Sequence, residues 1–116
     1  MATKSGWTVG FFNDAVRKDM RKLPKPLRVK FEYVRDLILD KGLGELPWHY
    51  IKSLSGEDGL WELRLRRDGM TARAIYLQWD GMRVIILVVF SKKSQHIPKH
   101  ILQLARQRAK EFKNAQ

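Results

Sequence analysis

The sequence contains no cysteine, which excludes disulfide bonds, thiolate nucleophiles and metal sites built on thiolates. It also lacks a long apolar run: the longest, Val84–Phe90, is far shorter than the roughly 20 residues that a membrane-spanning helix needs. The opening stretch MATKSGWTVG has no apolar segment of the kind found in signal peptides. We therefore expect a cytoplasmic protein that makes no contact with a membrane.

Acidic residues are scarce relative to basic ones. The chain has 12 Asp plus Glu against 23 Lys plus Arg, a formal net charge of +11. This charge favours anionic partners, either nucleic acid or an acidic protein, although a surface that is basic only for solubility would explain it too. Since 44% of the 116 residues are hydrophobic and neither repeats nor a Gly/Ser-rich linker divide the chain, we expect one domain over residues 1–116.

Signatures of common cofactor and catalytic sites are missing as well. GLGEL and GEDG match neither a P-loop nor a dinucleotide fingerprint, and no serine lies in a GxSxG context. The histidines His49, His96 and His100 show no metal-binding spacing, and Pro98 separates the last two, which disfavours a zinc pair on one helix. We expect neither a metal nor an organic cofactor.

The N-terminal part of the chain predicts a strand and a helical hairpin. WTVGFF, at residues 7–12, is rich in aromatic and β-branched residues, as strands are, and the ND that follows is a favourable helix cap. Apolar residues at helical spacing then predict helices over residues 14–23 and from Leu27 to Ile38, which PKP separates and KGLG ends.

The middle of the chain predicts four strands joined by turns. The strands are WHYIKSL (48–54), LWELRLR (60–66), TARAIYLQW (71–79) and RVIILVVF (83–90). SGEDG, RDGM and DG lie between them, and DG is a strong hairpin signal. RVIILVVF is apolar throughout, as expected of a central strand buried on both faces.

A C-terminal helix is predicted to begin at Pro98, since proline is favourable in a first turn. Its inward face comprises Ile101, Leu102, Ala105, Ala109 and Phe112. Its other face is cationic and comprises Lys99, Gln103, Arg106, Lys110 and Lys113. The order β, α, α, β, β, β, β, α predicts an α+β fold, in which a mostly antiparallel twisted sheet is covered by the N-terminal helical hairpin and the C-terminal helix.

Basic residues collect on the predicted strands. LWELRLR alternates, so Arg64 and Arg66 share the face opposite to its apolar residues. Arg73 lies on the next strand, and Lys92 and Lys93 follow the last one. Adjacent antiparallel strands can bring these groups together, where guanidinium and ammonium groups would bind phosphate oxygens. The residues alone leave open whether this is a catalytic site or only a solvated, phosphate-binding surface.

Aromatic and apolar neighbours complicate this cluster. Counting by twos puts Arg73 on the same face as Ile75 and Leu77, unless a bulge or twist intervenes, and puts Tyr76 on the opposite face, in the core. The tryptophans are interpreted as structural residues rather than base-stacking platforms. They are Trp7, Trp48, Trp61 and Trp79.

Three segments are similar to motifs of a known family. They are GLWELR at 59–64, ARAIY at 72–76 and FSKKSQHIPKHIL at 90–102. Their order and spacing resemble the RelE/HigB superfamily of bacterial toxins, in particular its phage-derived RelE-like branch. LPKPLRVKF and GLGEL also resemble the helical hairpin of that branch, so the resemblance spans nearly the whole chain.

The resemblance implies the toxin of a type II toxin–antitoxin pair, a small α+β ribonuclease that enters the ribosomal A site and cuts mRNA. In that family the reaction needs no metal or cofactor: the RNA 2′-hydroxyl attacks its own phosphodiester and leaves a 2′,3′-cyclic phosphate and a 5′-hydroxyl. The implied partners are mRNA, the ribosome and a cognate helix-turn-helix antitoxin encoded adjacently. A free toxin that is a monomer would suit the A site.

The resemblance also implies roles for individual residues. Arg64 and Arg73 match basic strand residues that hold the phosphate, and Lys92 and Lys93 match the basic pair after the last strand. Lys93 is the foremost candidate to stabilise the phosphorane or to protonate the leaving 5′-oxygen. His96 replaces the lysine or threonine common in the branch and is a secondary acid–base candidate. RNA-binding side chains are expected at Arg66, Lys99, Arg106 and Lys110.

Two other functions stay open at this point. Gyrase-directed toxins share the scaffold without the ribonuclease residues, and a noncatalytic nucleic-acid-binding module would have the same charge. The basic residues Arg64, Arg73 and Lys93 favour RNA cleavage, because a gyrase inhibitor has no need of phosphate clamps at those positions.

Overall fold

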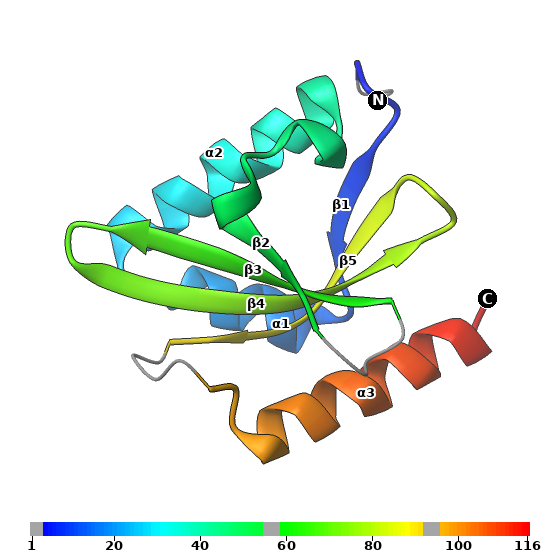
Figure 1. Ribbon diagram of the computed structural model, residues 1–116. Coiled ribbons are helices and arrows are strands. Elements are labelled where there is room, and N and C mark those ends of the chain that lie inside the picture. The colour runs from blue at the N-terminus through cyan, green and yellow to red at the C-terminus, as the bar shows by residue number, and fades with distance from the viewer. Residues whose placement is uncertain (1–3, 55–58, 92–95) are drawn as a thin grey trace.

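The computed structural model describes residues 4–54, 59–91 and 96–116 (Figure 1). Its helices and strands follow the predicted order, and two short 3-10 turns, η1 and η2, precede the second strand. The elements are β1 (Thr8–Phe11), α1 (Asp14–Arg21), α2 (Lys25–Lys41), η1 (Leu43–Glu45), η2 (Trp48–Tyr50), β2 (Ile51–Ser53), β3 (Leu60–Arg67), β4 (Met70–Trp79), β5 (Arg83–Phe90) and α3 (Lys99–Asn114). The predicted α+β class is confirmed.

The strands form a five-stranded sheet in the order β1-β5-β4-β3-β2. The strands β2 to β5 make an antiparallel meander, and β1 pairs in parallel with β5. The sheet is thus mostly antiparallel, as predicted. β5 lies inside it, and its residues Val84–Val89 are all buried, which confirms the interpretation of its apolar run.

Local chemistry sets the ends of the first two helices. Asn13 caps α1, because its side-chain oxygen accepts a hydrogen bond of 3.0 Å from the backbone N–H of Val16. Pro24 precedes α2, where a missing N–H costs nothing. Gly42 ends α2 with a φ of 95°, in a region that glycine occupies without steric penalty. The predicted cap and both predicted ends are therefore confirmed.

Helices cover both faces of the sheet. In Figure 1, α2 lies above the sheet and α3 below it. One hydrophobic core forms on the side of α1 and α2, and a smaller one forms against α3 around Ala105 and Ala109. The predicted inward face of α3 is confirmed. Within the described ranges, no helix is both long and apolar enough to cross a membrane.

Successive side chains of the central strands point to opposite faces and pack into the two cores in turn. On β4, Ala74 and Tyr76 pack in the α1–α2 core, while Ile75 and Leu77 pack against α3. Tyr76 is 1% exposed, so its predicted place in the core is confirmed.

Two glycine turns join the three longest strands. Asp68 and Gly69 connect β3 to β4 with φ values of 53° and 76°, and Asp80 and Gly81 follow β4 with φ values of 54° and 78°. Positive φ at two successive residues matches the right-handed twist of a hairpin, and Asp-Gly is a favoured pair for it. Both predicted turns are confirmed.

The prediction for residues 48–54 is wrong in its first half. Only Ile51–Ser53 form a strand, because a hydrogen bond of 3.0 Å from the backbone N–H of Tyr50 to the carbonyl of Pro47 closes a 3-10 turn at η2. Trp48, which was interpreted as a structural residue, is 83% exposed. Aromatic residues suggested a strand here, but the turn after Pro47 outweighed that propensity. The other three tryptophans pack against the cores.

Candidate anion-binding site

Arg64 and Arg73 lie opposite each other on β3 and β4. They are direct partners in the antiparallel register, so their side chains leave the same face of the sheet, the one that α3 partly covers. A β-bulge does occur nearby, but it lies in β5, where Leu87 is the additional residue. The alternation of β4 is unbroken, and Arg73 shares its face with Ile75 while remaining beside Arg64.

Glu62 joins the two arginines. Its carboxylate is 2% exposed and accepts a hydrogen bond of 2.9 Å from Nε of Arg64. Its other oxygen lies 3.8 Å from Nη1 of Arg73. Removing one partner of a buried ion pair typically costs about 3–5 kcal/mol, so the carboxylate holds both guanidinium groups in place.

Arg73 has unused hydrogen-bond donors. It is 7% exposed, and its Nε and Nη1 atoms find no hydrogen-bond acceptor among the described residues. Buried donors of this kind are rare in folded proteins, where most buried polar groups are paired. Arg73 also lines a pocket, so an anion bound there would lie beside this guanidinium.

A pocket of about 300 Å³ opens over this pair. Its lining consists of Lys52, Arg64, Arg66, Thr71 and Arg73. Four of these side chains are basic, and with the carboxylate of Glu62 beside them the local formal charge is 4 − 1 = +3. The pocket can hold an anion such as one phosphodiester of a nucleic acid.

Strand β5 ends beside the pocket. Phe90 pairs with Arg73, and the hydroxyl of Ser91 donates a hydrogen bond of 3.2 Å to the carbonyl oxygen of Thr71. The next two residues, Lys92 and Lys93, lie outside the described residues, so their place in the site stays a prediction.

The remaining predicted residues do not all meet at the pocket. Arg66 lines it. His96 and Lys99 are exposed near the start of α3, and Arg106 and Lys110 are exposed further along that helix. None of these four lines the pocket, so the α3 side chains belong to a separate basic surface.

Sequence reasoning missed three residues of this site. Glu62 stands two positions before Arg64 on the same strand, so alternation puts both on one face, and an acid at that spacing is a usable signal for their pairing. Lys52 pairs with Glu62 in the register of β2 and β3, which the sequence alone does not determine. Thr71 carried no signal of its own.

The chemistry of this site is electrostatic. No group of three or more histidine, aspartate or glutamate side chains able to hold a metal occurs in the part of the chain that the structure describes. Fixed guanidinium groups can bind phosphate oxygens and stabilise the extra charge of a pentacoordinate transition state, because they need no reorganisation when that charge develops.

The chain matches one family model. Its description is "Phage derived protein Gp49-like (DUF891)", and the match covers residues 18–110. That range holds α2, the strands β2 to β5 and most of α3, and so includes every residue that lines the pocket. No curated protein matches the chain.

Proposed function

The chain belongs to the Gp49-like family of phage-derived proteins, and from that premise we propose that it is the toxin of a type II toxin–antitoxin pair. Its activity in this proposal is metal-independent, ribosome-dependent cleavage of mRNA. The observation that carries the proposal is the buried guanidinium of Arg73, whose unused donors lie beside Arg64 in a basic pocket.

The proposed reaction is an internal transesterification. The 2′-oxygen of one nucleotide attacks the adjacent phosphorus, the bond from phosphorus to the 5′-oxygen breaks, and the products are a 2′,3′-cyclic phosphate and a 5′-hydroxyl. One proton leaves the 2′-hydroxyl and one reaches the 5′-oxygen, so neither water nor an oxidant is consumed. Arg64 and Arg73 bind the non-bridging oxygens, while Glu62 fixes their orientation.

Proton transfer in this proposal falls to residues at the end of β5. Lys93 protonates the leaving 5′-oxygen or stabilises the phosphorane, with Lys92 as a second cation. His96 is the second acid–base residue of the proposal and accepts or donates a proton. Arg66, Lys99, Arg106 and Lys110 bind the RNA backbone as it crosses the basic surface.

The proposed partners follow from the same function. They are mRNA on the ribosome and a cognate helix-turn-helix antitoxin, and the free toxin is a cytoplasmic monomer. An acidic antitoxin complements the net charge of +11.

Expression in bacteria with controlled induction tests the proposal. We expect induction of the native chain to stop translation, and sequencing of RNA ends to show cuts inside translated codons with 5′-hydroxyl termini. Arg73→Lys keeps the charge but loses the planar fork, and Arg64→Ala removes one phosphate donor, so each should lower the cleavage rate about 100-fold or more. Lys93→Ala should do the same.

The controls are chosen for fold and charge. Thermal melts verify that each variant is folded, and Lys18→Ala, an exposed change on α1 away from the pocket, should cleave like the native chain. Equal cleavage by the native chain, Arg73→Lys and Lys93→Ala would contradict the site assignment. Intact mRNA with trapped gyrase–DNA complexes would favour the gyrase-directed alternative, and RNA binding without any product would favour a noncatalytic module.

A further inference from the structure

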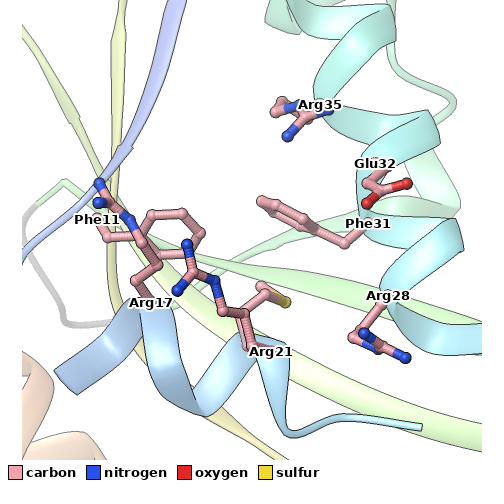
Figure 2. A pocket seen from close by; sticks show the side chains of 8 residues that line it. Phe11, Arg17, Arg21, Arg28, Phe31, Glu32 and Arg35 are labelled. Carbon is pink, nitrogen blue, oxygen red and sulfur yellow. The ribbon is translucent and has the colours of Figure 1, made fainter. Parts of the chain in front are cut away.

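A second pocket lies between α1 and α2, on the face of the sheet opposite to the candidate site (Figure 2). Its volume is about 470 Å³, larger than the 300 Å³ of the pocket at Arg73. Nothing in the proposed reaction uses it. We call it the α1–α2 pocket.

Four arginines surround the α1–α2 pocket. Figure 2 shows that they come from facing helices: Arg17 and Arg21 from α1, and Arg28 and Arg35 from α2. Each pair is spaced by four or seven residues, which places its members on one face of their helix. Glu32 is the one acidic residue of the lining, so its formal charge is 4 − 1 = +3.

Two of these arginines make no ion pair within the described ranges. Arg17 lies 3.6 Å from Asp14 and Arg35 lies 3.3 Å from Asp36, both as exposed pairs of the kind that contribute little. Arg21 and Arg28 are exposed, and within the described ranges neither makes an ion pair or hydrogen bond. Their guanidinium groups are free to bind carboxylates in a bidentate manner.

The pocket also has an apolar floor. Phe31 points toward Phe11 in Figure 2, and their ring centroids are 5.9 Å apart. Phe31 and Met20 belong to the α1–α2 core, with exposures of 4% and 5%, so this floor is rigid. The guanidinium of Arg17 lies 5.5 Å from the centre of the Phe11 ring, which joins the floor to the charged rim.

This combination favours a protein over a nucleic acid as the occupant. A phosphate chain would use the arginines but not the apolar floor. An apolar centre inside a charged rim is the usual arrangement of a binding hot spot between proteins.

We propose that the α1–α2 pocket binds an acidic segment of a partner protein. An aliphatic side chain of that segment packs on Phe11 and Phe31, and flanking carboxylates bind Arg21 and Arg28. The proposal goes beyond the ribonuclease function and does not depend on it, since the pocket lies on the opposite face of the sheet from Arg73.

Peptide binding to the full chain tests this proposal. The probe is a fluorescent, glutamate-rich synthetic peptide with leucines at helical spacing, and binding is followed by anisotropy at low salt. The double variant Arg21→Glu/Arg28→Glu should weaken binding at least about tenfold. The matched control Lys18→Glu/Lys41→Glu changes the same net charge on the same two helices at exposed positions outside the pocket, and it should change affinity by less than about threefold.

Three further measurements make the outcome decisive. Replacing leucine by serine in the peptide should weaken binding to the native chain, because the apolar anchor is lost. Equal losses in both double variants, or no binding by the native chain, would overturn the proposal. A selective loss of single-stranded RNA binding in Arg21→Glu/Arg28→Glu would show a nucleic-acid site instead. RNA cleavage by that variant is expected to be unchanged, which separates this result from a failure of the proposed function.

Discussion

Two buried charged side chains, Glu62 and Arg73, lie beside the half-buried Arg64 on one face of the sheet. Arg64, Arg73 and Glu62 form a chain of ion pairs with Glu62 at its centre, and Arg73 keeps donors that find no acceptor among the described residues. Buried ion pairs of this kind seldom add to stability, and apolar residues of equal size would often serve the fold better. In the proposed function these residues bind a phosphate, which would account for their presence.

The sequence predicted the two arginines of this group but not its carboxylate. Strand alternation is enough to put Arg64 and Arg66 on one face, because it depends only on the period of the backbone. The pairing of Glu62 depends on burial and on side-chain geometry, which a linear pattern does not contain.

Tyr76 provides a prediction at the scale of one atom. Its hydroxyl is buried and has no hydrogen-bond partner among the described residues, and burial raises the pKa of the phenol above its usual value of 10.0. Tyr76→Phe removes a desolvated polar group, so at neutral pH the free energy of unfolding should be equal or higher by about 1 kcal/mol. Chemical denaturation followed by circular dichroism measures it.

The raised pKa of Tyr76 also predicts how the stability difference between the native chain and Tyr76→Phe depends on pH. Because the folded state keeps the Tyr76 proton above pH 10 while the unfolded state loses it, the native chain binds more protons when folded. Its stability relative to Tyr76→Phe should therefore be constant below pH 10 and fall above it, by at most about 1.4 kcal/mol per pH unit. A pH-independent difference would contradict the assigned burial of the hydroxyl.

Among the elements, the β3–β4 hairpin presents most of the pocket. Arg64 and Arg66 lie on one strand and Thr71 and Arg73 on the other, so the turn at Asp68 and Gly69 sets their relative positions. The sequence predicted this hairpin well, because Asp-Gly is a local signal. It predicted β2 only in part, because a short edge strand owes its extent to the neighbouring strand rather than to its own residues.

A pair of glycine substitutions tests the role of that turn. Gly69 has a φ of 76° and no atom near the position of a new Cβ, so Gly69→Ala should cost about 1 kcal/mol through backbone strain alone. Gly10 on β1 has the same open surroundings without positive φ, and Gly10→Ala should be neutral or slightly stabilising. Urea unfolding of both proteins measures the difference, and equal effects would contradict the strain argument.

The whole molecule carries basic surfaces on both sides of its sheet. The pocket at Arg73 lies on the face that α3 partly covers, and the α1–α2 pocket lies on the other face. The net charge predicted anionic partners. It could not distinguish the two pockets, because a total for the whole chain does not show where the basic residues lie on the surface. The two arrangements differ: the first has the buried guanidinium of Arg73 and the half-buried one of Arg64 beside a carboxylate, and the second has exposed guanidinium groups around phenylalanines.

The salt dependence of RNA binding distinguishes contacts at the pocket from binding to the general charge of the surface. The logarithm of the affinity for single-stranded RNA should fall linearly with the logarithm of salt concentration, by about 0.7 for each phosphate contact. Lys52→Ala and Arg66→Ala, both at the rim of the pocket, should each reduce that slope by about this amount. Lys18→Ala should leave it unchanged, and an equal reduction there would indicate binding to the general charge of the surface.

The parallel pairing of β1 with β5 constrains the order in which the chain can fold. Thr8 lies next to Arg83 in the finished sheet, a separation of 83 − 8 = 75 residues along the sequence. On a ribosome that releases the chain from its N-terminus, β1 must wait for nearly the whole protein before it finds its partner. The helical hairpin can form early, whereas the sheet that carries Arg64 and Arg73 is completed only when synthesis is almost over.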